Sequence, residues 1–119
     1  MTAITRAARI RQLTNVGTPS QTLFSGPCVV FGATLCNFCQ SAQPQIVRLY
    51  DDTQATRTTA PVFTAIVTRA VSSHISFGES GVLFRKGCTV RVTGNTPADD
   101  DTEVGRNALT FWFKAEKDN

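Results

Sequence analysis

The sequence predicts an all-β fold: one antiparallel, jelly-roll-like β-sandwich domain with an extended N-terminal arm. Apolar and polar residues alternate with a period of two over most of the chain, which is the pattern of strands that bury one face. The composition includes 17 Thr and 11 Val, which favour strands, and Gly and Pro recur between the alternating segments. A chain of 119 residues with 41% hydrophobic residues has room for one core and no second domain.

The alternation places eight strands along the body of the chain. Residues 88–93 show it clearly, because Val90 and Val92 share one face while Arg91 points to the other. Turn-forming residues separate this segment from the others. The predicted strands are residues 21–24, 28–35, 45–50, 62–68, 73–77, 81–84, 88–93 and 109–114.

The formal net charge of +3 lies entirely at the N-terminal end. Residues 1–15 hold Arg6, Arg9 and Arg11 and no acidic residue, whereas the rest of the chain carries nine basic and nine acidic side chains. Residues 3–13 could form a helix, but an extended arm is the alternative that we prefer. We therefore expect a basic arm over residues 1–15 and a sandwich domain over residues 16–119.

An acidic run lies late in the chain, where Asp99, Asp100 and Asp101 follow one another and Glu103 comes soon after. It lacks the spacing and the glycine of an EF-hand calcium loop, so we expect a solvated loop or a docking surface for a basic partner. Three arginines are too few for a nucleic-acid surface. No stretch approaches the roughly 20 apolar residues of a membrane span. The expected partners therefore include neither nucleic acid nor membrane.

The motif Cys36-Asn37-Phe38-Cys39 resembles the active-site segment of thioredoxins, in which a buried strand delivers two cysteines to the start of a helix. The helix dipole there lowers the pKa of the first thiol. However, the residues before the motif form no β-α unit, and the last third of the chain alternates like strand. A thiol oxidoreductase is therefore kept as an alternative.

Other chemistry in the sequence gives no strong site. The motif cysteines could complete a four-thiolate zinc shell with Cys28 and Cys88, but only one close-spaced pair exists, and buried thiols are the simpler interpretation. His74, the single histidine, has no nucleophile motif beside it and is expected on an edge or loop. We expect no enzyme activity, no cofactor and no metal.

Residues 12–94 resemble the small β-sandwich virion proteins of tailed bacteriophages, which decorate or cement capsids or belong to the tail. The most recognisable pieces are the strand end Leu49-Tyr50-Asp51 and the hairpin from Gly81 to Gly94. The resemblance implies a non-enzymatic protein on the capsid surface, assembled in the host cytoplasm. Its implied partners are the major capsid protein and further copies of itself, most simply as a homotrimer.

Two sets of charged residues are the expected partner contacts. Arg6, Arg9 and Arg11 come first, because an extended arm can cross a neighbour's surface or add a strand to its sheet. The acidic run Asp99, Asp100 and Asp101 comes second. The alternative is a tail or fibre protein that binds glycans through exposed aromatic residues, with Trp112 and Tyr50 as the pair to examine.

Overall fold

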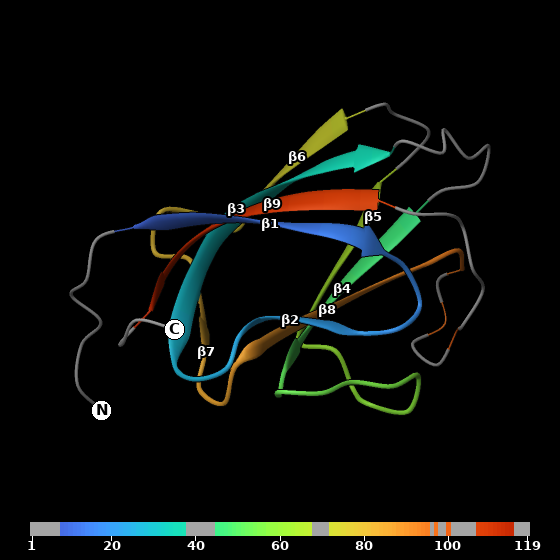
Figure 1. The fold of residues 1–119 in the computed structure, drawn as a ribbon, viewed down its shortest axis with the longest axis horizontal. Helices are drawn as coiled ribbons and strands as arrows, with labels where there is room; N and C mark the ends of the chain where they lie inside the picture. The colour runs from blue at the N-terminus through green and yellow to red at the C-terminus, as the bar shows by residue number, and fades with distance from the viewer. Residues whose placement is uncertain are drawn as a thin grey trace.

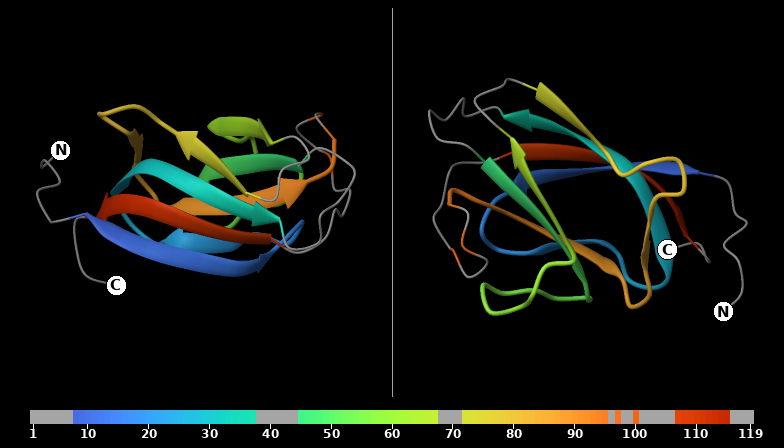
Figure 2. Two further views of the ribbon diagram at one scale, coloured as in Figure 1. Left: turned by 90° about the horizontal axis from the view of Figure 1, so that it is seen from above. Right: turned by 180° about the vertical axis from the view of Figure 1, so that it is seen from behind.

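The computed structural model describes residues 8–37, 45–67, 72–95, 97, 100 and 107–115. Over these residues the chain forms strands and turns and no helix, and its strands make two antiparallel sheets that pack face to face (Figure 1 and Figure 2). The predicted β-sandwich is confirmed. None of the described segments forms a helix that is long and apolar enough to cross a membrane.

The chain crosses between the two sheets several times along its length. The first sheet has the order β1 (Arg9–Val16), β9 (Asn107–Ala115), β3 (Cys28–Asn37) and β6 (Ser72–Ser76), and β7 (Val82–Phe84) also pairs with β3. The second sheet has the order β2 (Gln21–Phe24), β8 (Cys88–Thr93), β4 (Gln45–Asp51) and β5 (Phe63–Val67). Two pairs of consecutive strands, β4–β5 and β6–β7, each lie within one sheet. All eight predicted strands are present. The jelly-roll connectivity stays a prediction.

The hydrophobic core lies between the sheets and follows the predicted alternation. Val90 and Val92 of β8 are fully buried in it, as are Phe111 of β9 and Leu49 of β4. Each such side chain stabilises the fold by roughly 1.5–3 kcal/mol relative to an exposed one. The core therefore holds the two sheets in one fixed arrangement, which sets the relative positions of their edge strands.

The expected arm over residues 1–15 is wrong for residues 9–15, because these form most of strand β1. This strand pairs antiparallel with β9, from Arg9 opposite Phe113 to Leu13 opposite Leu109. Leu13 and Val16 are buried in the core, so the start of the chain completes the first sheet. The boundary expected after residue 15 thus falls inside a strand, and the helical alternative is wrong for residues 9–13. Arg6 lies outside the described residues.

The two segments that carry the resemblance meet at one end of the sandwich. The Oδ1 atom of Asp51 accepts hydrogen bonds from the backbone N–H groups of Arg85, at 3.0 Å, and Lys86, at 2.8 Å. Gly87 follows with a φ of 155°, and a Cβ there would lie 2.7 Å from the carbonyl oxygen of Phe24. The carboxylate thus fixes the connection from β7 to β8, and glycine is the residue that this close approach permits.

Candidate functional site

A seam between the two sheets runs along β1 and β2, which are the edge strands of the first and the second sheet. Antiparallel partners share a face. Because Arg9 pairs with Phe113 and Arg11 with Phe111, both arginines lie on the face of β1 that continues toward the core. The sequence places two cations where apolar side chains would ordinarily close the sandwich. Inward-pointing charges on an edge strand hinder its pairing with another chain.

Arg9 covers the apolar mouth of this seam. Its guanidinium carbon lies 5.2 Å from the ring centroid of Phe24 on β2 and 5.7 Å from that of Phe113 on β9. A cation over an aromatic face at this range contributes about 0.5–1 kcal/mol at a partly exposed position. Arg9 therefore joins the edges of the two sheets.

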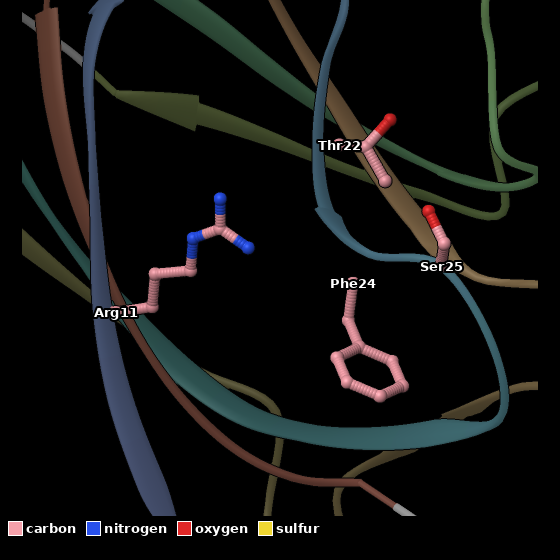
Figure 3. Close-up of a pocket in the computed structure, with 4 residues that line it drawn as sticks. All are labelled: Arg11, Thr22, Phe24 and Ser25. Atoms are coloured by element: carbon pink, nitrogen blue, oxygen red, sulfur yellow. The ribbon is translucent and has the colours of Figure 1, made fainter. Parts of the chain in front are cut away.

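Arg11 lines a notch of about 420 Å³ between β1 and β2, together with Thr22, Phe24 and Ser25. Its Nη1 atom donates a hydrogen bond of 2.6 Å to the carbonyl oxygen of Leu23. Figure 3 shows the guanidinium extending from β1 toward the β2 residues, with the hydroxyls of Thr22 and Ser25 on the opposite side. The side chain is exposed, so its remaining donors are accessible to an anionic group. We call this site the basic notch.

The chemistry of the basic notch suits a carboxylate. A guanidinium presents planar, paired donors that match the two oxygens of a carboxyl group. The one hydroxyl proton of Thr22 is already donated to the carbonyl oxygen of Thr53 at 2.8 Å, whereas Ser25 adds an exposed hydroxyl that can donate to a carboxylate oxygen. The notch can therefore bind and orient an acidic side chain from a partner.

Asp100 is the one described residue among the three aspartates of the acidic run, and it does not line the basic notch. The Oδ2 atom of Asp100 accepts a 3.0 Å hydrogen bond from the backbone N–H of Asn95, and Oδ1 accepts one of 3.3 Å from the Asn95 amide. Asp100 thus closes its own loop. Asp99 and Asp101 lie outside the described residues. The structure brings Arg9 and Arg11 together as predicted contacts, although on a strand rather than an arm.

Sequence reasoning missed a second pair of arginines, on the outer face of the second sheet. Arg48 and Arg91 are register partners on β4 and β8, and each is only 1% exposed. The Nη2 atom of Arg48 donates to the carbonyl oxygens of Asn95, at 2.6 Å, and Pro97, at 2.9 Å, while Nε of Arg91 donates to that of Thr18 at 2.7 Å. These charge-assisted bonds fasten loops over the sheet. The alternation showed that Arg91 points outward, but it could not show that loops cover that face.

The described cysteines are core residues. Cys28 and Cys88 are free thiols, both fully buried. Burial raises the pKa of Cys28 to about 12, with the charge of Asp51 adding to the effect. Burial also raises the pKa of Cys88 well above its ordinary value, and Cys28 and Asp51 contribute. Both therefore stay protonated and unreactive at neutral pH. In the described part of the chain no three His, Cys, Asp or Glu side chains gather as metal ligands.

Cys36, the first cysteine of the thioredoxin-like motif, lies within β3. Ser72 of β6 is opposite it on one side and Ala108 of β9 on the other, so its backbone is in the interior of an antiparallel sheet. The segment in which the motif would start a helix lies outside the described residues, and the oxidoreductase alternative stays a prediction. Cys39 lies outside the described residues.

The structure also separates the two aromatic residues proposed for glycan binding. Tyr50 is fully buried on β4, where its hydroxyl accepts a 3.4 Å hydrogen bond from Nη1 of Arg91. Trp112 lies on β9 in the other sheet, 5.6 Å from His74 between ring centroids. His74 is exposed on the edge strand β6, as expected. Trp112 and His74 line a depression of about 390 Å³, with Phe31 among its other residues.

Comparisons with known proteins add little to this geometry. No protein-family model and no curated protein matches the chain. A chain from the solved structure titled "Bacillus endospore appendages form a novel family of disulfide-linked pili" is 11% identical, with a TM-score of 0.42, over 97% of this chain and 96% of that one. A TM-score and an identity this low carry no inference about fold or function. What the described residues define is a β-sandwich protein with a basic notch at one seam.

Proposed function

We propose that the protein is a non-enzymatic structural protein of a tailed-bacteriophage virion, and in particular a cement or decoration protein that binds the major capsid shell. The observation that carries this proposal is the basic notch. It presents the guanidinium of Arg11 across from the exposed hydroxyl of Ser25 at the edge of the sandwich, which is a surface for protein recognition. The resemblance of the segments that Asp51 joins supports the virion assignment.

Attachment in this proposal depends on an acidic side chain of the shell protein that enters the basic notch. Such a pair is partly exposed, so it adds about 0.2–1 kcal/mol and fixes the register of the two proteins more than their affinity. Many copies on one shell multiply weak contacts through effective concentration. A homo-oligomer on the capsid surface fits this arrangement, and the trimer stays a prediction.

The test is occupancy of capsids that lack the protein. Purified wild type, the double variant R9A/R11A and a control, Arg85→Ala, are added to such capsids, and bound copies are counted by quantitative electrophoresis. Arg85 is an exposed arginine in the turn after β7 and is not among the residues that line the notch. We expect the double variant to lose about two- to fivefold in apparent affinity, equivalent to roughly 0.4–1 kcal/mol, and the control to bind normally. Normal occupancy by R9A/R11A contradicts the role of the notch, and absence of wild-type binding contradicts the capsid role.

A second candidate function is glycan binding by a tail or fibre protein, because Trp112 and His74 line an open depression on the first sheet. The partly exposed indole of Trp112 can stack on the apolar face of a sugar ring, while nearby polar groups bind the sugar hydroxyls. Thr34 lies within reach, since its Oγ1 atom is 3.3 Å from Nδ1 of His74. Binding on a glycan array that is abolished in Trp112→Ala supports this candidate, and no binding by the wild type excludes it for the glycans tested.

A further inference from the structure

Strand β5 forms the outer edge of the second sheet, at the side of the sandwich opposite the basic notch. It pairs with β4 from Phe63 opposite Leu49 to Val67 opposite Gln45. Among the described residues, no strand pairs with its other side. In an antiparallel pair, alternate residues turn their N–H and C=O groups away from the partner strand. β5 therefore offers backbone groups for the addition of another strand.

The edge also carries an apolar stripe. Val62, which immediately precedes β5, is 54% exposed, and Ile66 is 59% exposed. Ile66 lies on the outer face, because it pairs with Ile46 while the neighbouring pair of Ala65 with Val47 faces the core. Val62 lies just before the paired segment, where its N–H donates to the carbonyl oxygen of Leu49. Within the described part of the chain, only one other large hydrophobic side chain is comparably exposed. The stripe runs along the free edge itself.

Two of the usual protections of an edge strand, charged side chains and proline, are absent from β5 as the structure describes it. The sequence from Thr58 to Val67 contains no Lys, Arg, Asp or Glu, and Pro61 lies before the strand rather than within it. Natural sheets discourage edge pairing with charges, prolines, bulges or a covering element. The inner side of the edge is closed, since the rings of Phe63 and Phe77 lie 4.4 Å apart between centroids. The rings of Phe63 and Phe77 thus pack on the core side of β5, and no described strand pairs with its outer edge.

The neutrality of the strand argues for a second copy of this chain as its partner. When two identical strands pair antiparallel about a two-fold axis, the same short segment of each copy lies opposite the other, so any charge would meet its like nearby. The stretch from Thr58 to Val67 contains no charge to repel its counterpart, and its apolar stripe is complementary to itself. A partner with charged side chains would find no opposite charge to pair with in this stretch.

We propose that β5 of one copy pairs antiparallel with β5 of a second copy, which joins the two four-stranded sheets into one continuous sheet. Val62 and Ile66 of both copies then contact one another across the joined edge. A strand of five residues buries less than the roughly 800 Å² per partner of a standard interface. The pairing is therefore weak in solution and gains strength where copies are held side by side. It goes beyond attachment through the notch and predicts a dimer.

The test is sedimentation equilibrium of the full chain at concentrations up to about 1 mM, where a dissociation constant near 100 µM gives a clear dimer. The variant Ile66→Lys brings two positive charges together across the edge and should weaken dimerisation at least tenfold. Its matched control is Ile10→Lys, because Ile10 is 67% exposed on β1, an edge strand of the other sheet. The control should change the dissociation constant less than about twofold. Thermal melting of each variant checks that the fold is kept.

Hydrogen exchange at two protein concentrations gives a second readout. Amides of β5 should gain protection at the higher concentration, while those of β6 should not. A monomer at about 1 mM, a mass of three copies, or equal weakening by both lysine variants overturns the inference. A monomeric protein that still occupies capsids overturns this inference alone. A β5 dimer that leaves capsids empty overturns the proposed function alone.

Discussion

The two seams of the sandwich differ in how their edge strands are protected. At the β1/β2 seam, Arg9 and Arg11 point inward from the edge, and Arg9 covers the ring of Phe24. At the β5/β6 seam, the rings of Phe63 and Phe77 close the core, and the edge strand beside them is neutral. One edge strand therefore carries inward-pointing charges, and the other is neutral along its length. This difference is why we propose different partners for the two edges, an acidic group for β1/β2 and a second copy of the same strand for β5.

The largest expected difference between the seams is in stability. Phe24 is 1% exposed beneath Arg9, whereas Phe63 is only partly buried. Phe24→Ala should lower the free energy of unfolding by about 3–5 kcal/mol, because it leaves a cavity and removes the surface that Arg9 covers. Phe63→Ala should cost about 1–2 kcal/mol, since part of that ring is already in water. Urea denaturation measures both. Equal losses would contradict the view that the notch rests on a tightly packed core.

The second prediction concerns pH, because two buried thiols lie below the notch. Burial raises both pKa values, to about 12 for Cys28 and well above the ordinary value for Cys88. Above pH 9 the unfolded chain loses these protons while the folded chain keeps them, so stability is full below pH 9 and falls between about pH 9 and 12. Each thiol contributes at most about 1.4 kcal/mol per pH unit. The slope of the unfolding free energy between pH 8 and about 10.5 should be shallower in C28A/C88A than in wild type. Parallel slopes would mean that water reaches these thiols.

The third prediction tests whether the charges of Arg9 and Arg11 prevent β1 from pairing with another copy. Replacing both inward arginines, in R9L/R11L, should let β1 pair between copies, because the charges that oppose such pairing are gone. The change is made in the Ile66→Lys background, where the β5 edge is already blocked. Association should reappear with a dissociation constant near or below 100 µM, measured by sedimentation equilibrium. If this triple variant stays monomeric, the two arginines are not what prevents β1 from pairing between copies.

The sequence predicted the strands better than the seams. The strands were predicted from β-branched residues, from turn residues between segments and, in residues 88–93 and 109–114, from a period of two, and all of these signals are local. Strand β1 was not predicted, because Arg9 and Arg11 occupy inward positions where apolar residues are expected. A basic arm was therefore the interpretation that the sequence favoured. The notch depends on Arg11 and Leu23 meeting across two sheets, which no local pattern reports. The role of Arg9 and Arg11 as partner contacts stays a prediction, now placed on strand β1 rather than on an arm.

The smallest predicted effect distinguishes the seams by salt. Attachment through the basic notch rests on a partly exposed ion pair, and salt screens such pairs over a Debye length of about 10 Å at 0.1 M and about 3 Å at 1 M. Raising NaCl from about 0.05 to 0.5 M should therefore weaken capsid binding several-fold, as measured by occupancy. Dimerisation through β5 involves no charge in its paired segment, so its dissociation constant should change less than about twofold. If dimerisation is the more salt-sensitive of the two, the charged and the neutral edge have been assigned to the wrong partners, because only an interface that contains charge can respond strongly to screening.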